Sequence, residues 1–324
     1  MLMSVLLFAI GLVLLIKGGD WFVDGATGIA KRFNLPDIVV GATVVSIGTT
    51  LPEVMVSTTG ALQGSGAMAY GNAIGSIICN TALIAAISIV CNPGPVNTKS
   101  MKTPAIFFFL SAALYCLASY VLGTFPRWMG FVMLGIFVVY MVTTVRNGMK
   151  NPDAIEEEEA EEGKQRTLVM ELVLLVVGAA VIAVGADLLV EHGQIIAIGL
   201  GVPETVVALL FVALGTSLPE LVTTITSLRS GHASLGVGNV IGANVFNLVL
   251  VSGVAVSLAP FDVPCENTLL NTGLNMSLVF EIPVMLGVMA LMIFPTLASK
   301  KLARWQGILL LGIYAAFCVC QFIL

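Results

Sequence analysis

Charged side chains are scarce in this sequence. Of its 324 residues, 10% are charged and 58% are hydrophobic, and the mean hydropathy is +1.03. A soluble globular protein has about 25% charged residues. A chain with so few charges cannot cover a surface that faces water, so we interpret it as an all-α polytopic membrane protein in contact with a lipid bilayer.

The sequence also lacks the side-chain groupings that many enzymes and metal-binding domains use. It has two histidines, His192 and His232, and six cysteines, most of them in apolar runs without disulfide or metal-ligand spacing. It shows no nucleophile–base pair, histidine cluster or nucleotide-binding loop. We therefore expect no catalytic site, no cofactor and no nucleic-acid partner.

Long hydrophobic runs take the place of these motifs. A window of about 19 residues predicts ten membrane spans. The first run has no basic segment before it and no small-residue cleavage site, so we interpret it as a retained span and not as a signal peptide. The predicted limits are 2–27, 37–62, 69–91, 103–123, 127–147, 167–190, 204–228, 235–258, 276–297 and 304–323.

Basic residues predict the orientation of these spans. The loops after the odd-numbered spans hold 12 of the 14 Lys and Arg residues, whereas the other loops and both termini hold only Arg127. By the positive-inside rule, the odd-numbered loops are cytoplasmic and both termini are outside. We expect the protein in the inner (cytoplasmic) membrane of a cell. The acidic linker 149–166 would be cytoplasmic, and its run of glutamates is more typical of a solvated segment than of a cation site.

An internal repeat is the strongest signal in the sequence. Shifted by 167 residues, the chain matches itself without gaps over about 60 positions. "IGTTLPE" (47–53) aligns with "LGTSLPE" (214–220), and "GNAIGSIICN" (71–80) aligns with "GNVIGANVFN" (238–247). Other aligned pairs are Asp20 with Asp187, Pro36 with Pro203, and Asp37 with Glu204.

Each copy of the repeat contains an odd number of predicted spans. Two homologous halves must then lie in opposite orientations, which predicts two inverted five-helix repeats, residues 1–148 and 167–324. Inverted repeats with broken helices are typical of transporters whose binding site lies at the repeat interface near the bilayer midplane.

The repeated motifs combine helix-breaking residues with oxygen-bearing side chains. A proline inside a helix frees the carbonyl four residues earlier, so Pro52 frees Gly48 and Pro219 frees Gly215. Free carbonyls at membrane depth are tolerated only when they are buried or line a wet cavity. The hydroxyls and carboxylates beside them form an all-oxygen environment, which hard cations such as Ca²⁺ and Na⁺ prefer.

The two motif glutamates, Glu53 and Glu220, need a partner. An acid at the centre of a membrane span costs about 3 kcal/mol on translocon scales. Because no Lys or Arg lies near the centre of any predicted span, we expect a mobile cation or a proton to neutralise them. We predict that Glu53 faces Glu220 across the repeat interface with a cation between them; protonation or pairing with a hydroxyl is the simpler alternative.

The second motif of each copy follows a G-xxx-G spacing, which favours close helix packing. Asn72, Ser76 and Asn80 share one helix face, whereas Ala243 interrupts the corresponding face of Asn239 and Asn247. We interpret Asp37 and Glu204 mainly as helix-start residues that interact with the helix dipole. Glu281 lies near the outer end of span nine. It is either another helix-start residue or a charge in the outer vestibule of the transporter.

These motifs resemble the α-1 and α-2 repeats of the cation/Ca²⁺ exchanger superfamily, in particular its prokaryotic Na⁺/Ca²⁺ exchanger-like branch. The resemblance implies a ten-helix fold in which spans two, three, seven and eight form the core and spans one and six slide across it. It implies Thr49, Thr50, Glu53, Ser76 and Asn80 as ion ligands from the first repeat. From the second repeat it implies Thr216, Ser217, Glu220 and Asn247, together with main-chain carbonyls at Ser46 and Ala213.

The chain departs from that pattern at two positions. The archaeal-type site of the family has an aspartate where this chain has Asn247 and a serine where it has Ala243. The site here therefore offers two carboxylates, which one Ca²⁺ or two Na⁺ would neutralise and three Na⁺ would leave at +1. The departures bear on ion preference and on proton coupling.

The leading hypothesis is a secondary antiporter that exchanges Na⁺ for Ca²⁺ by alternating access and expels Ca²⁺ with the Na⁺ gradient. We expect a monomer to suffice for transport. A Ca²⁺/H⁺ or other divalent-cation antiporter using the same glutamates is the alternative. A cation channel is a weaker one, because channels more often place such acids in the pore of a symmetric oligomer.

Overall fold

A computed structural model describes residues 2–150, 166–200, 215–264 and 275–323. These residues are almost entirely helical. The helices are α1 (Leu2–Arg32), α2 (Asp37–Val40), α3 (Ser46–Leu62), α4 (Gly66–Cys79), α5 (Ala86–Cys91), α6 (Thr98–Cys116), α7 (Arg127–Met149), α8 (Leu168–Gly199), α10 (Leu218–Arg229), α11 (Ala233–Phe246), α12 (Ser252–Leu258), α13 (Ile282–Ser299) and α14 (Arg304–Ile323).

Wider π-helical turns interrupt or begin several of the long helices. They are η1 (Gly41–Val45), η2 (Asn80–Ala85), η3 (Leu117–Leu122), η5 (Asn247–Val251) and η7 (Ser277–Glu281). Two short antiparallel ladders join loops: β1 (Gly94–Pro95) pairs with β4 (Lys301–Leu302), and β2 (Thr124–Phe125) pairs with β3 (Phe261–Asp262).

Within the described residues, eight helical stretches are long and apolar enough to cross a membrane. They correspond to the predicted spans one to six, eight and nine, so the prediction of a helical multi-pass protein is confirmed. The predicted tenth span is the apolar helix α14 of 20 residues. Of the predicted seventh span, only α10 and the few residues before it are described, because 201–214 lie outside the described residues. Helices α1 and α8 extend further than predicted, to Arg32 and Gly199.

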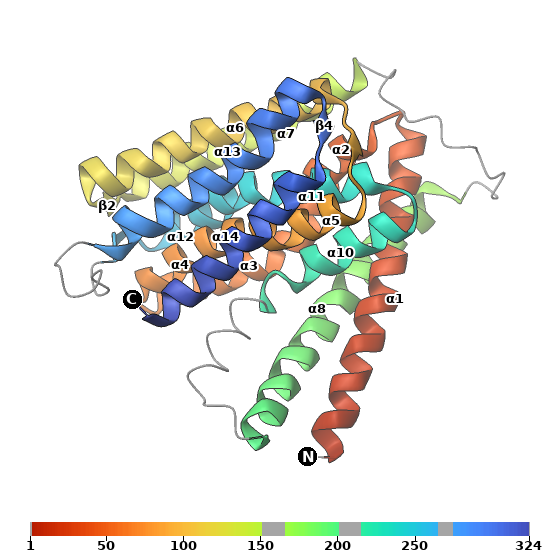
Figure 1. Ribbon diagram of the computed structural model, residues 1–324, viewed down its shortest axis with the longest axis horizontal. Helices are drawn as coiled ribbons and strands as arrows, with labels where there is room; N and C mark the ends of the chain where they lie inside the picture. The colour runs from red at the N-terminus through yellow and green to blue at the C-terminus, as the bar shows by residue number, and fades with distance from the viewer. Residues whose placement is uncertain (1, 151–165, 201–214, 265–274, 324) are drawn as a thin grey trace.

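Helices α1 and α8 form an antiparallel pair that projects beyond the other helices (Figure 1). Glycines bring their backbones together: a Cβ atom on Gly11 would lie 2.9 Å from the carbonyl oxygen of Gly185, and one on Gly25 would lie 2.6 Å from that of Glu171. In a bilayer, such close backbone approach is a main source of helix association. The pair can therefore act as one packed unit.

Helix α11 lies at the centre of the remaining helices. Its span, Ala233–Leu258, is 83% buried, compared with 28% for α1 and 22% for α8. Glycines again permit close contact, because a Cβ atom on Gly238 would lie 2.2 Å from the carbonyl oxygen of Ile38 in α2. The close helix packing that the G-xxx-G spacing predicts is therefore present at this glycine of span eight. At Gly71 and Gly75 in α4, the equivalent glycines of the sequence repeat, no described atom lies within 4 Å of an added Cβ.

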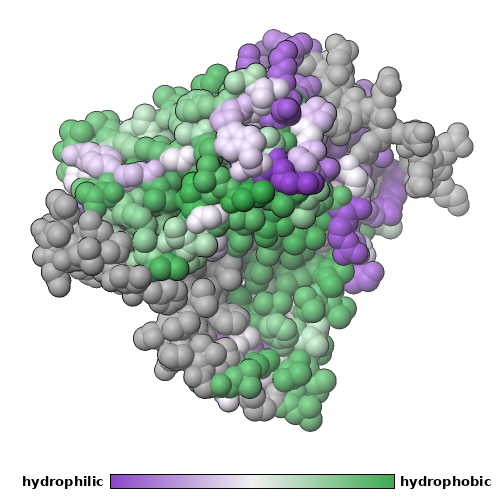
Figure 2. Space-filling view, viewed as in Figure 1, coloured by the Kyte–Doolittle hydropathy of each residue, from purple (hydrophilic) through white to green (hydrophobic). Residues whose placement is uncertain are grey.

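The outer surface matches a bilayer environment. Figure 2 shows hydrophobic residues over the long helices, with hydrophilic residues gathered towards the end that carries β4 and the C-terminal end of α1. Large apolar side chains such as Val121 and Phe131 are exposed on the protein surface, at 71% and 61%. Lipid, not water, suits such a surface.

One expectation about charge is wrong. Because α1 runs from Leu2 to Arg32, Lys17 lies at its middle, so one basic residue does occupy the centre of a span. Its amine pairs with Asp20 on the same helix at 3.5 Å, and both side chains are substantially exposed. Lys17 is therefore no counter-ion for the buried glutamates.

Candidate functional site

The first carboxylate of the site lies on α3. The π-helical turn η1 precedes this helix, and Pro52 lies inside it, so the helical hydrogen bonding is disturbed on both sides of the motif. Glu53 is fully buried, and neither of its carboxylate oxygens has a hydrogen-bond partner among the described residues. The hydroxyl oxygen of Thr50 is buried and unpartnered as well.

The second carboxylate lies at the start of α10. Thr216 and Ser217 precede this helix, and Glu220 lies in its first turn, where the helix dipole favours an anionic side chain. Glu220 is fully buried, and both of its carboxylate oxygens lack a described partner. The two glutamates are close enough to interact electrostatically, and the hydroxyl of Thr49 lies beside Glu220. The two copies of the motif thus meet in space.

Two amides complete this buried set. Asn80 and Asn247, which align in the sequence repeat, are each the first residue of a π-helical turn. Both are fully buried, and the nitrogen and oxygen of each amide lack a described partner. Ser76, one turn before Asn80, is 3% exposed. Because π-helical turns occur often at functional sites, their position at both asparagines supports a shared role.

Two other asparagines hold the framework of the site. The amide oxygen of Asn239 accepts hydrogen bonds from the hydroxyls of Ser46 at 3.2 Å and Thr49 at 3.1 Å. The amide nitrogen of Asn72 donates to the carbonyl of Glu53 at 3.2 Å and to the hydroxyl of Ser57 at 2.8 Å. Sequence reasoning treated these asparagines only as oxygen donors on helix faces. Asn72 and Asn239 align in the sequence repeat, and this alignment could have indicated that they share a structural role.

Asn72 also connects the two copies of the motif. The hydroxyl of Thr216 donates to its amide oxygen at 3.4 Å, so one side chain joins the backbone of α3 to the residues before α10. The structure thus brings Glu53, Thr49 and Ser46 of the first copy near Glu220 and Thr216 of the second, directly or through Asn239 and Asn72. The other described candidates, Thr50, Ser217, Ser76, Asn80 and Asn247, are buried as well. Ala213 lies outside the described residues.

Other acidic residues singled out from the sequence lie elsewhere. Asp37 is the first residue of α2, as expected for a helix start, and its carboxylate contacts the ring of His232 at 2.6 Å. Glu281 accepts hydrogen bonds from Ser277 and Gln321. Glu204 lies outside the described residues. The described residues hold no group of three or more His, Cys, Asp or Glu side chains around one point, so a cation here would depend on neutral oxygens beside the two carboxylates.

A cavity of about 810 Å³ borders the site. It lies between α8 and α3, and its wall includes Gly48, Pro52, Gly215, Thr216 and Pro219 of the two motifs. The corresponding contact between α1 and α10 is closed: a Cβ atom on Gly19 would lie 2.7 Å from the side chain of Val222. The repeat equivalents of these two residues, Ala186 and Met55, both line the cavity. The two sides of the site therefore differ.

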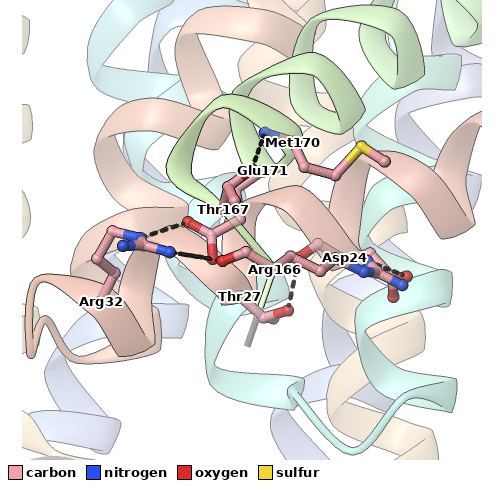
Figure 3. A network of polar contacts seen from close by, with 7 residues as sticks. All are labelled: Asp24, Thr27, Arg32, Arg166, Thr167, Met170 and Glu171. Carbon is pink, nitrogen blue, oxygen red and sulfur yellow. Dashed lines mark hydrogen bonds and ion pairs between the residues drawn. The ribbon is translucent and has the colours of Figure 1, made fainter. Parts of the chain in front are cut away.

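Ion pairs join α1 to the start of α8, on the side where the α1–α10 contact is closed (Figure 3). The guanidinium of Arg32 binds the carboxylate of Glu171, with 2.9 Å between Nε and Oε2, and donates to the carbonyl of Arg166 at 2.6 Å. Arg166 in turn pairs with Asp24 at 2.9 Å. The side chain of Glu171 is 7% exposed, so this contact is a packed one and not a surface contact.

The fold and the site together define a multi-pass membrane protein that buries two carboxylates near hydroxyl side chains, between two similar helix motifs. The family described as sodium/calcium exchanger protein matches residues 3–146 and 170–323. The chain belongs to this family, which confirms the resemblance seen in the motifs.

Similar proteins cover the whole chain. An uncharacterized membrane protein of Methanocaldococcus jannaschii, MJ0091, is 34% identical over 95% of this chain and 94% of its own length. The sodium/calcium exchanger MaX1 of Methanosarcina acetivorans is 29% identical over 98% of both chains. A solved structure of the sodium-calcium exchanger NCX_Mj, soaked with Na⁺ and Sr²⁺, superposes with a TM-score of 0.80 at 31% identity over 98% of both chains.

Proposed function

We propose that this protein is a secondary antiporter that exchanges Na⁺ for Ca²⁺ across the membrane. The observation that carries the proposal is the pair of fully buried glutamates, Glu53 and Glu220, whose four carboxylate oxygens have no described hydrogen-bond partner. Two uncompensated charges at this depth are strongly unfavourable. A cation bound between them supplies the missing charge, and membership of the exchanger family indicates Na⁺ and Ca²⁺.

The proposed ligand set contains the two carboxylates, the hydroxyls of the two motifs and the amide oxygens of Asn80 and Asn247. Unpartnered oxygens of Thr50, Ser217, Asn80 and Asn247 support it. Ser46 and Thr49 are different, because their hydroxyls donate to Asn239. The oxygens of these hydroxyls retain lone pairs that can accept a cation. The resemblance to the family adds the main-chain carbonyls of Ser46 and Ala213 to the proposed set.

Competition for the same oxygens enforces exchange. One Ca²⁺ or two Na⁺ neutralise two carboxylates, and a third Na⁺ leaves the site at +1. The carrier therefore changes its exposure with either ion set bound but not with the site empty, because two carboxylates would then lack a compensating charge, and this couples the two fluxes. Na⁺ entering down its gradient would drive Ca²⁺ out of the cell.

The chain is proposed to form ten spans in two inverted repeats, residues 1–148 and 167–324, joined by the cytoplasmic linker 149–166. Both termini would lie outside, and the membrane would be the inner membrane of a cell. The antiparallel packing of α1 on α8 and the meeting of the two motifs support this arrangement. With this orientation, α3 is in the outer half of the membrane and α10 is in the inner half.

It follows that the structure corresponds to an outward-facing state. The cavity separates α8 from the outer half helix α3, whereas α1 is packed on the inner half helix α10. If the α1–α8 unit slides along the core, the contact between Gly19 and Val222 opens as the one between Ala186 and Met55 closes. Such a movement exposes the glutamates to each side in turn.

The experiment is ⁴⁵Ca²⁺ uptake into proteoliposomes loaded with Na⁺, compared with K⁺-loaded and pH-jumped controls. Wild-type protein should take up Ca²⁺ only with internal Na⁺, and both Glu53→Gln and Glu220→Gln should abolish uptake. Asp262→Asn, at an exposed carboxylate in β3, is the matched control and should leave uptake unchanged. Uptake driven by a pH gradient alone would support Ca²⁺/H⁺ exchange instead, and the absence of uptake under every gradient would refute Ca²⁺ as the substrate.

A further inference from the structure

Asp187 is an acidic side chain in an unusual place. It lies well inside α8, one of the long apolar helices, yet its side chain is exposed. Among the described residues that line the cavity between α8 and α3, it is the one charged group. Ionisable residues within membrane helices face protein interiors or water-filled cavities, because lipid contact is too costly. This position therefore indicates that the cavity is wet where Asp187 borders it.

The equivalent residue in the first repeat is Asp20, and its surroundings differ. Asp20 pairs with Lys17, three residues earlier, at 3.5 Å. The residue equivalent to Lys17 in α8 is Val184, and no ion pair joins Asp187 to any described residue. Of the two equivalent acids, the one at the cavity keeps an uncompensated negative charge.

The two acids also lie on opposite sides of the helix crossing. Asp187 follows Gly185, which packs against Gly11 in the first third of α1. Asp20 follows Gly18, which packs against Gly178 and Ile182 in the first half of α8. With both termini outside, Asp187 is on the outer side of the crossing and Asp20 is on the inner side.

We propose that Asp187 is an entry residue, whose carboxylate attracts cations from the outer solution into the cavity before they reach Glu53 and Glu220. The inference rests on the proposed function, because it assigns a role on the path to that site. Thr216 lines the same cavity and belongs to the motif, so the cavity is continuous from Asp187 to the motif. Low-dielectric walls concentrate the field of such a charge and raise the local cation concentration.

The test measures the KM for external Ca²⁺ in sealed right-side-out membrane vesicles loaded with Na⁺. Asp187→Asn should raise this KM about fourfold at low ionic strength, the Coulomb estimate for a divalent ion about 10 Å from one charge in water. The maximal rate should stay unchanged, and the KM difference should shrink as salt screens the charge. Val184→Lys, which copies the pairing of Lys17 with Asp20, should have the same effect without removing the carboxylate.

Glu191→Gln is the matched control. Glu191 is an exposed acid one turn further along α8 and does not line the cavity, so its replacement should change the KM less than Asp187→Asn does. Equal increases of the KM in the two variants would show that the KM depends on general surface charge, and this would overturn the entry role of Asp187. A lower maximal rate with unchanged KM in Asp187→Asn and Val184→Lys would overturn it as well, because it would indicate a structural role.

A second measurement does not depend on transport. In Asp187→Cys, a membrane-impermeant thiol reagent added outside should label the new cysteine above the wild-type background. Absence of labelling would refute a wet path to this position. A wild-type protein without Na⁺-driven Ca²⁺ uptake would refute the proposed exchange, whereas active wild type with an unchanged KM in Asp187→Asn refutes only the entry role.

Discussion

Replacement of Gly238 by alanine tests how closely α11 packs on the broken helix before the site. A Cβ atom on Gly238 would lie 2.2 Å from the carbonyl oxygen of Ile38 and 2.8 Å from its Cα, both backbone atoms. Real Cβ atoms essentially never approach other atoms closer than 3.0 Å. The two helices would therefore have to separate by roughly 1 Å, since backbone cannot rotate away as a side chain can.

The expected cost follows from overpacking. Inserting a methyl group into a packed interior costs about 1–3 kcal/mol. At about 2–4 °C per kcal/mol for a chain of this size class, the apparent Tm should fall by about 2–12 °C. The displaced segment, α2 with η1, leads directly to Ser46, so transport should weaken as well.

The assay heats the detergent-solubilised protein to a series of temperatures and measures the fraction that remains folded by size-exclusion chromatography. Gly287→Ala is the control, because Gly287 lies within α13 and no described atom is within 4 Å of its added Cβ. It reports the gain of about 1 kcal/mol that alanine brings to a helix by propensity alone. Equal apparent Tm values for the two variants would refute the reasoning about close packing.

Two further predictions concern charged and polar positions. Glu171→Gln should lower the apparent Tm by several degrees, because it removes the buried partner of Arg32. Asp24→Asn should change the apparent Tm little, because the ion pair of Asp24 is about half exposed. Equal shifts of the two variants in thermal unfolding would contradict this distinction. Asn247→Asp adds a third buried carboxylate to Glu53 and Glu220, since Asn247 is fully buried as they are. Ca²⁺ binding, measured by isothermal titration calorimetry, should therefore depend more steeply on pH than in wild type. Identical pH profiles would show that residue 247 is not at the cation site.

Much of the candidate site could be predicted from the sequence. The two copies of the motif already identify Glu53 and Glu220 as a pair, because equivalent residues in a repeat occupy equivalent places. The structure brings the two together, and their carboxylate oxygens have no hydrogen-bond partner among the residues that it describes, as the scarcity of internal basic residues predicts. Their role as cation ligands stays a prediction until transport or binding is measured.

The framework around the site could not be predicted in the same way. Asn239 receives hydrogen bonds from Ser46 and Thr49 across separations of 193 and 190 residues in the chain. Asn72 connects Glu53 to Thr216, which lies 144 residues away from it. Nothing local in the sequence distinguishes these asparagines from Asn80 and Asn247, whose amide atoms have no partner in the described part of the chain. Only the packing of the helices decides which amides form hydrogen bonds between helices and which remain available to bind a cation.

The sequence by itself determined that this is a multi-pass membrane protein, where most of its spans lie and which residues repeat. Hydropathy, prolines, glycines and charge bias act along the chain, and the bilayer makes them decisive because unpaired backbone and charge are costly in lipid. The tertiary structure alone decided that Asp187 borders a cavity, and that α1 is packed on α10 while α8 stands apart from α3. Two nearly equivalent halves can pack in more than one way, so this asymmetry depends on contacts between distant segments and not on any local pattern.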